Sequence, residues 1–410
     1  MLKIFNGQKL GDKRTINLFG FPLYMYENTS NSYVKEFLGG FISINRNKSK
    51  IRDLKTFRVF NKTVYVRMIE DDFINYYFSG KLVKKVSLTN LFYKKYLKKV
   101  KYTYDDVYIL DCNSGEIYLF LAYIAKAFLK KNNSQSPLFV ATKKYHVDIL
   151  KIYYPNAKYI FVPKSKLKTK SSYWKINGHQ FFMLFSSDYF GKIEKDIKYG
   201  EINSVHYFDR MLEYLGLTRK DCTASNITIP TDDQKSLYEK VNKLGLNLNN
   251  FIILAPEALT CEEIEYLFWQ NLADELLKRN FDVYINVTCQ NLPFKNCKNT
   301  SLNYREVLFL AQKAKAVISL RSGLSEFLLS TEIPNITIYT KFRDRGSSGF
   351  SVDKGIAGFS MAKIPFVKKE NIIELNYENF INYNELVNKI LKELENLNVL
   401  TESKKEENLI

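Results

Sequence analysis

The sequence predicts an α/β protein with two β/α domains in series. From Val107 to Pro163, apolar runs of strand length alternate with longer runs of helical period, in the order β-α-β-α-β. The same alternation restarts at Phe251 and continues to Thr340. Strands that alternate with helices form parallel sheets through right-handed crossovers. We therefore expect two Rossmann-like domains, with a ligand cleft between the carboxyl ends of their strands.

Changes in composition indicate the domain boundaries. Residues 1–104 hold short aromatic strands separated by basic stretches, which favour an extension packed on the first domain and not a repeat. Residues 105–230 form the first Rossmann-like domain and end in a polar linker with Pro230. Residues 231–390 form the second domain. Residues 391–410 hold the end of the terminal helix and a polar tail.

Each domain has a predicted order of elements. The first has strands at 107–112, 137–142, 158–163 and 179–185, and helices at 116–131, 145–154 and 204–217, the last ended by Gly216. The second has strands at 251–255, 281–287, 316–320 and 335–340, and helices at 262–280, 303–314 and 322–329. A terminal helix at 378–397 is expected to cross back onto the first domain.

The composition excludes several classes of protein. Hydrophobic residues make up 46% and aromatic residues 15% of the 410 residues, which indicates a folded chain. The longest apolar run, 117–125, is too short to span a bilayer, and the N-terminus lacks a signal-peptide pattern. We therefore expect a cytoplasmic protein. The cysteines show no CxxC spacing and the three histidines do not cluster, so neither a metal site nor a disulfide framework is expected.

The net charge of +18 is unevenly distributed. The segment Lys81–Lys101 carries eight lysines and no acidic residue, interleaved with Leu, Phe and Tyr. Such a segment suits an anionic membrane surface. A solvated helix face is the simpler alternative, and nucleic-acid binding is a third, although no recognised nucleic-acid motif accompanies the charge. The lysines that would face a membrane or acceptor are Lys84, Lys85, Lys94, Lys95, Lys98 and Lys99.

The stretch AVISLRSGLSEFLLSTEIPNITIYT at 316–340 predicts a strand, a tight turn, a helix and a second strand. A turn of this kind presents backbone N–H groups to a phosphate. Arg321 offers a planar fork for two phosphate oxygens, and Gly323 allows close approach of the backbone. The alternative makes Ser322 an ordinary N-cap and Arg321 a solvent-facing strand end. Glu326 suits either a sugar contact or the positive end of the helix dipole.

Four segments carry a family resemblance: ILAPEA at 253–258, Phe268-Trp269, VYINV at 283–287, and VISLRSGLSEFL at 317–328. Together they resemble bacterial GT-B glycosyltransferases of surface-polysaccharide biosynthesis. They are more distantly similar to the ADP-heptose heptosyltransferases of glycosyltransferase family 9. The resemblance implies a GT-B fold, in which two Rossmann-like domains face each other across a cleft.

The resemblance also implies a distribution of roles. The second domain would hold the nucleotide-diphosphate sugar, with Pro256, Glu257 and Ala258 facing the donor and Arg321, Ser322, Gly323, Leu324 and Ser325 holding its phosphates. Heptosyltransferases place an Asp at the first strand-to-helix turn as the base, and Glu116 stands in that turn here. Asp111 is the alternative base. Leu259-Thr260-Cys261 stand where the family places a lysine in this loop, so the basic loop KSKLKTK at 164–170, or Lys341, Arg343 and Arg345, would supply that cation.

The expected function is transfer of a sugar to a lipid-linked, lipopolysaccharide or capsular glycan. We expect an inverting, metal-independent reaction without a cofactor, at the inner face of the cytoplasmic membrane. The expected partners are the nucleotide sugar, the acceptor, an anionic membrane and a second copy of the chain, with no nucleic acid. A non-catalytic GT-B-like binding subunit, or another group transferase on the same fold, is the alternative.

Overall fold

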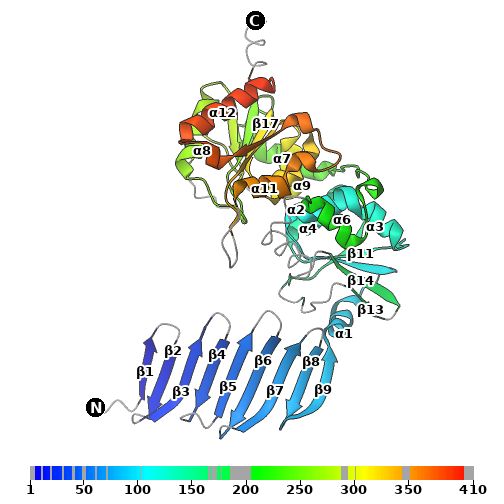
Figure 1. Ribbon diagram of the computed structural model, residues 1–410, viewed down its shortest axis with the longest axis vertical. Helices are drawn as coiled ribbons and strands as arrows, with labels where there is room; N and C mark the ends of the chain where they lie inside the picture. Colours follow the sequence, from blue (N-terminus) through cyan, green and yellow to red (C-terminus); the bar gives the residue numbers. More distant parts are fainter. Residues whose placement is uncertain are drawn as a thin grey trace, which may run out of the picture. The chain divides into compact units, whose positions relative to one another are not determined.

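The computed structural model divides the chain into two compact units, Met1–Thr103 with Val162–Phe182, and Tyr104–Phe161 with Met183–Ile410 (Figure 1). The structure describes residues 5–10, 13–18, 21–29, 32–38, 42–48, 52–60, 62–70, 73–101, 103–164, 167, 173–176, 178–184, 205–287, 294–300, 302–343 and 351–400. Among the helices in these ranges, none is long and apolar enough to cross a membrane.

The first unit is built on a nine-stranded antiparallel sheet in which each strand pairs with the next along the chain (Figure 1). Short connections such as Ser79-Gly80, where both residues have positive φ, favour this hairpin order. The sequence predicts short strands here, but it does not predict that they form one sheet. The strands are β1 Phe5–Leu10, β2 Lys13–Leu18, β3 Phe21–Asn28, β4 Ser32–Phe37, β5 Ile42–Lys48, β6 Arg52–Val59, β7 Lys62–Glu70, β8 Phe73–Phe78 and β9 Lys81–Ser87.

A short helical segment follows the sheet. Helix α1 (Leu88–Phe92) continues into a π-helical turn (Tyr93–Leu97), and Leu88, Phe92 and Leu97 are buried. The interpretation of Lys81–Lys101 as one helix face is wrong for its first third, because Lys81–Ser87 is the last strand of the sheet. The unit also contains most of an antiparallel hairpin made by β13 (Tyr173–Ile176) and β14 (His179–Leu184).

The second unit begins with three parallel strands, β10 (Asp106–Leu110), β11 (Leu138–Ala141) and β12 (Lys158–Phe161). Every residue of β10 and β11 is buried, as expected for a parallel strand covered on both faces. This part confirms the β-α-β-α-β order predicted from the sequence. The intervening helices are α2 (Ser114–Leu119), which continues through a π-helical turn (Phe120–Ile124) into α3 (Ala125–Lys131), and α4 (Lys144–Tyr153); α6 (Tyr207–Leu215) ends at Gly216, as predicted.

A five-stranded parallel sheet of order β16-β15-β17-β18-β19 forms the rest of the unit. Its strands β15, β16, β17 and β18 were predicted, whereas β19 and the helices α7 and α11 were not. The strands are β15 Phe251–Ala255, β16 Asp282–Ile285, β17 Ala316–Leu320, β18 Asn335–Tyr339 and β19 Ile372–Asn376. The helices are α7 Thr231–Leu244, α8 Tyr266–Leu277, α9 Tyr304–Ala311, α10 Gly323–Leu328, α11 Val352–Phe359 and α12 Tyr383–Asn396.

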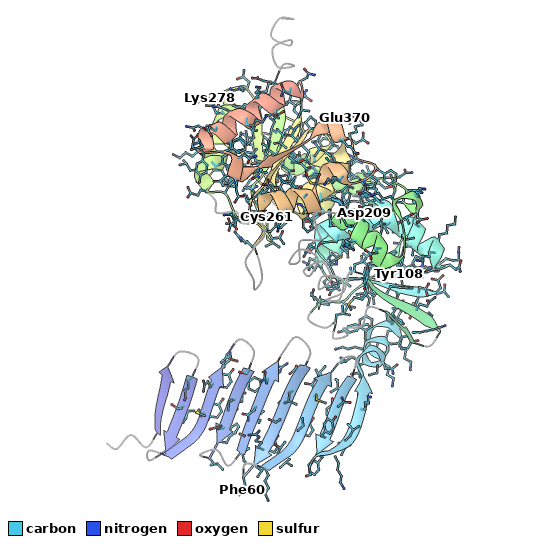
Figure 2. The ribbon with its side chains drawn as sticks, in the orientation of Figure 1. Phe60, Tyr108, Asp209, Cys261, Lys278 and Glu370 are labelled. Carbon is cyan, nitrogen blue, oxygen red and sulfur yellow. The ribbon has the colours of Figure 1, made fainter. Side chains whose placement is uncertain are left out.

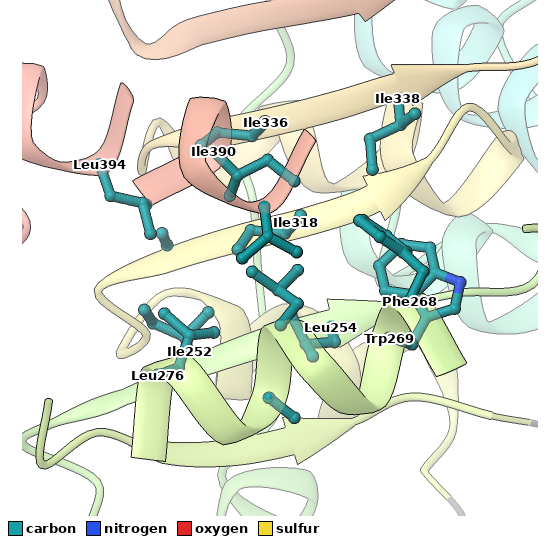
Figure 3. Packing of buried hydrophobic residues seen from close by; sticks show 14 of the residues in the cluster. Ile252, Leu254, Phe268, Trp269, Leu276, Ile318, Ile336, Ile338, Ile390 and Leu394 are labelled. Carbon is teal, nitrogen blue, oxygen red and sulfur yellow. The ribbon is translucent and has the colours of Figure 1, made fainter. Parts of the chain in front are cut away.

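The terminal helix α12 packs on this second sheet, which corrects the expectation that it crosses back onto the first domain. Its buried residues, including Ile390 and Leu394, belong to the same apolar cluster as Ile252 and Ile318 of the sheet (Figure 3). Trp269 of α8 lies in the same cluster. Apolar residues at helical spacing on α12 therefore complete the core of their own domain.

Candidate active site

Two helices begin against each other at the carboxyl ends of their strands. Helix α2 follows β10, and α10 follows β17. A Cβ atom added to Gly115 would lie 3.2 Å from the Cα of Gly323 and would overlap the carboxylate of Glu326. A Cβ atom added to Gly323 would lie 2.8 Å from the backbone N of Gly115 and would overlap the hydroxyl of Ser114. Only glycine allows the two backbones to approach this closely.

The hydroxyl groups of Ser322 and Ser325 cap α10, the helix that follows the turn Arg321-Ser322-Gly323, named the RSG turn. Ser322 is the N-cap of α10, and its Oγ accepts a hydrogen bond of 3.2 Å from the backbone N–H of Ser325. The Oγ of Ser325 in turn accepts from the N–H of Ser322 and donates to its carbonyl oxygen. This reciprocal arrangement satisfies the first N–H groups of the helix. The N-cap alternative for Ser322 is thus the arrangement found, and Leu324 beside it is partly buried.

Arg321 lies in a buried ion pair. Its Nη2 donates to Glu326 Oε1, which also accepts from the hydroxyl of Tyr207 on α6. The guanidinium lies 5.6 Å from the ring centroids of both Tyr207 and Phe359. Arg321 and Glu326 are only 6% and 2% exposed. The alternative that makes Arg321 a solvent-facing strand end is wrong.

Glu116 lies one residue after Gly115 and is partly buried. Burial, followed by the nearby charge of Glu326, raises the pKa of its carboxyl to about 7, although Arg321 and Lys143 oppose the shift. A carboxyl with a pKa near 7 can both accept and release a proton at neutral pH. The turn that was predicted from the sequence to hold a base therefore holds a carboxyl with this property.

Asp111 lies at the end of β10, where Thr142 holds it. The Thr142 hydroxyl lies 3.1 Å from Asp111 Oδ1 and 2.9 Å from the carbonyl oxygen of Leu110. Behind it, buried His146 accepts from the N–H of Thr142 through Nδ1 and donates to the carbonyl oxygen of Cys112 through Nε2. The backbone N–H can only donate, which fixes the neutral tautomer of the imidazole.

Lys143 and Tyr207 were not predicted as site residues. Lys143 Nζ donates to the carbonyl oxygen of Cys112 at 3.3 Å and to the hydroxyl of Tyr145 at 2.6 Å. Because Lys143 follows β11, the neighbour of β10, the rule that ligands gather at the carboxyl edge of a parallel sheet would have found it. Tyr207 comes from α6, far away in the sequence, and no motif marks it.

The predicted donor loop lies at the end of β15. Pro256 and Ala258 are buried and Glu257 is partly exposed. Nearby, Cys261 forms an isolated bridge with Phe342, which places the end of this loop against the residues that follow β18. Lys341 and Arg343 flank Phe342 and pair with Glu378 and Glu263 at distances of 3.2 and 3.1 Å; both cations are exposed.

A pocket of about 320 Å³ is lined by Val205, His206, Asp209, Arg219, Ala357, Lys363 and Lys369, and neither Arg321 nor Glu326 lines it. Arg219 on its wall donates to both oxygens of Asp209 and to the carbonyl oxygen of Lys363.

Across the part of the chain that is described, no group of three or more His, Cys, Asp or Glu side chains could hold a metal ion. The predicted membrane-facing lysines all belong to the first unit; Lys84, Lys85, Lys94, Lys95, Lys98 and Lys99 are exposed.

No protein-family model matches the chain, and no curated protein matches it. Among solved structures it is similar to a glycosyl transferase of family 9 from Veillonella parvula, with 14% identity, a TM-score of 0.47, and 73% of this chain and 97% of the other covered. It is also similar to the Escherichia coli ADP-heptose lipopolysaccharide heptosyltransferase II, with 13% identity, a TM-score of 0.47, and 73% and 99% covered. A third is the iron-containing dodecameric glycosyltransferase TibC from enterotoxigenic E. coli, with 14% identity, a TM-score of 0.40, and 91% and 93% covered.

Proposed function

We propose that this protein is a glycosyltransferase that moves a sugar from a nucleotide-diphosphate donor to a hydroxyl group of a lipid-linked, lipopolysaccharide or capsular glycan. The observation that carries the proposal is the carboxyl group of Glu116. Its pKa is raised to about 7, and it lies at the contact between α2 and α10. A general base works best when its pKa lies near the pH at which the reaction runs.

The chemistry assigned to the site is a single displacement. Glu116 takes the proton of the acceptor hydroxyl while that oxygen attacks the anomeric carbon. The bond from this carbon to the diphosphate oxygen breaks, and the configuration inverts. Negative charge builds on the leaving diphosphate, where fixed cations lower the barrier most. The proposed cations are side chains and not a divalent metal ion. Asp111, held by Thr142, is the alternative base.

Donor binding at the RSG turn would require movement. Arg321 is bonded to Glu326, and Gly323 touches α2, so diphosphate oxygens would fit only if the two helix starts separate. In that state Arg321 would exchange Glu326 for a phosphate, with Ser322, Leu324 and Ser325 forming the turn around it. The exposed Lys341 and Arg343 would add positive charge, and Pro256, Glu257 and Ala258 would face the sugar or ribose. The acceptor would approach across a cleft from the carboxyl end of β10.

The first test is thermal unfolding of the full chain with UDP, GDP, CDP, ADP and CMP, each with and without EDTA. A nucleotide at about 100 times its Kd adds roughly 2.7 kcal/mol to the free energy of unfolding, which raises Tm by a few degrees. The expected result is a shift with one base that EDTA leaves unchanged and that Arg343→Ala reduces. The absence of a shift with every nucleotide would contradict the proposal.

The base is tested next, with sugars carried by whichever nucleotide binds. Glu116→Gln should keep the thermal shift and lower the rate of donor turnover by roughly 10²- to 10⁴-fold. Glu213→Gln is the matched control, because Glu213 is an exposed carboxylate on α6 that pairs with Arg210. Full turnover in Glu116→Gln, together with loss in Asp111→Asn, would transfer the role to Asp111.

One observation favours a second candidate function, a non-catalytic binding subunit. The charge of Arg321 is already neutralised by Glu326, and the helix starts are in contact, so the site is filled by the protein itself. A subunit of this kind would bind nucleotide or glycan weakly or not at all. It would keep its stability in Glu116→Gln and show no turnover in any variant.

A further inference from the structure

The hairpin connections of the nine-stranded sheet form two rows, one at each end of its strands, and each row is called an edge here. One edge carries exposed apolar residues at its hairpin tips. When each antiparallel strand pairs with the next along the chain, the connections alternate between the two ends of the strands. Those after β4, β6 and β8 therefore lie at the same end. Leu38, Phe60 and Phe78 lie at these three connections and are 54%, 70% and 55% exposed. Figure 2 labels Phe60 at the lower end of the sheet, beyond the strands.

Neighbouring residues extend this apolar edge. Leu82 and Val83, at the start of β9, are 52% and 62% exposed. The opposite edge is different, because the connection after β3 exposes Asn28 and Thr29. Single exposed apolar residues are ordinary, but a row of them along one edge of a sheet marks an interaction site.

Two of these residues are also unfavourable for the local backbone. Leu38 has a φ of 52° and Phe60 a φ of 48°, in the left-handed region that glycine and asparagine adopt most readily. A large side chain at such a position costs stability, and its exposure to water costs more. Both side chains are more than half exposed, which favours a contact with another surface.

Positive charge accompanies the apolar tips. Lys62 follows Phe60, Lys81 faces Phe78 across the last hairpin, and both lysines are exposed. Lys84 and Lys85 continue along β9, also exposed. Apolar tips flanked by lysines match the two layers of an anionic bilayer surface, which are acyl chains and charged headgroups.

We infer that this edge docks onto an anionic phospholipid membrane, with Leu38, Phe60 and Phe78 inserted at the headgroup boundary and the lysines against the headgroups. A second copy of the chain fits less well, because a symmetric contact through this edge would bring the same lysines together. The inference does not depend on the transferase activity. It assigns the membrane contact to the hairpin tips, and the lysines of Lys81–Lys101 add electrostatic attraction to the headgroups.

The test is sedimentation of the full chain with phosphatidylcholine vesicles that contain about 30% phosphatidylglycerol, an anionic surface. The variant is Leu38→Asn/Phe60→Asn, because asparagine suits the left-handed backbone and should not unfold the sheet. Its partition coefficient should fall about tenfold. The control is Ile381→Asn in the second unit, which removes an apolar side chain that is 90% exposed and should leave partitioning unchanged.

Salt and fluorescence give independent readouts. High salt should weaken the retention of the wild type without abolishing it, since salt screens the lysines but not the inserted side chains. Phe60→Trp should show a blue-shifted emission on vesicles relative to the wild type. Three results would overturn the inference: equal partitioning of the double variant and the wild type, no vesicle binding by the wild type, or a change of oligomeric state in the double variant that assigns the edge to contacts between copies.

Discussion

The α-carbon of Gly115 faces the carboxylate of Glu326, and a methyl group at Gly115 would overlap the Oε2 atom of that carboxylate. This contact joins α2, which follows β10, to α10, which follows β17 of the five-stranded parallel sheet. It also contributes to the pKa of Glu116, which burial raises most and the nearby charge of Glu326 raises in second place. Because α2 and α10 begin in contact, a change at Gly115 should affect both the stability of the second unit and the pKa of Glu116.

Gly115→Ala should destabilise the second unit by about 1–3 kcal/mol, because the added methyl group must displace Glu326 or separate α2 from α10. Denaturant unfolding followed by circular dichroism would measure the loss. Asn113→Ala is the control, since the side chain of this exposed N-cap makes no capping hydrogen bond and its loss should cost little. Equal stability of Gly115→Ala and the wild type would refute the contact.

Arg321→Met should cost about 3–5 kcal/mol, because it leaves the carboxylate of Glu326 buried without its cation. The double variant Arg321→Met/Glu326→Gln should recover much of this loss, since a neutral amide can still accept from Tyr207. Lys240→Met offers a comparison at a second buried carboxylate, Glu306. Its cost should be smaller, because Ser236 and the backbone of Asn303 continue to donate to Glu306. A double variant no more stable than Arg321→Met would show that packing dominates.

Glu116 should make the protein less stable as the pH rises. Its folded pKa of about 7 lies above the ordinary value of 4.5, so the folded state binds the proton more tightly. The stabilisation is complete below pH 4.5 and is lost as the pH rises through 7. As the pH rises from 4.5 to 7, the free energy of unfolding of Glu116→Gln should increase relative to that of the wild type by about 2 kcal/mol. This figure is reduced for the partial exposure of Glu116. A pH-independent difference in the free energy of unfolding would contradict the raised pKa.

His206 should have the opposite effect. Burial lowers the pKa of its imidazole to about 4 from the ordinary 6.5, and its Nε2 donates to the carbonyl oxygen of Ser360 at 2.8 Å. The unfolded chain binds the proton more readily, so stability falls as the pH drops from 6.5 towards 4. His206→Asn keeps an acceptor at the N-cap of α6 and should remove this acid sensitivity. Acid unfolding curves that superimpose for the variant and the wild type would contradict this assignment.

The effects of Glu116 and His206 oppose each other between pH 4.5 and 6.5. The wild-type protein should therefore show a shallow stability profile in that range, and each variant should show a steeper one of opposite sign. Unfolding of both variants at a series of pH values in one buffer system would test the two assignments together.

Much of the second unit could be predicted from the sequence. Buried parallel strands are continuous apolar runs, and amphipathic helices repeat every three to four residues, so β10, β11, β15, β17 and β18 and the helices between them were recognisable. The helix α7 was missed because its sequence is polar, and no helix or strand was predicted between Pro230 and Phe251. The nine-stranded sheet was missed as a whole because its two-sided strands lack a continuous apolar signal.

The sequence by itself determined the order of β10 to β12 and of β15 to β18 with the helices α2 to α4 and α8 to α10 between them, and the turn that holds Glu116, and it offered the Ser322 cap as an alternative. Each of these depends on neighbouring residues and the backbone between them. Only the tertiary structure decided that Arg321 pairs with Glu326, that Tyr207 joins them, and that the apolar tips share one edge. These contacts join residues from different elements, or depend on a side chain that points into the protein. Local sequence preferences do not specify either. Burial also set the pKa of Glu116, since a carboxyl group ionises according to the charges and solvent around it.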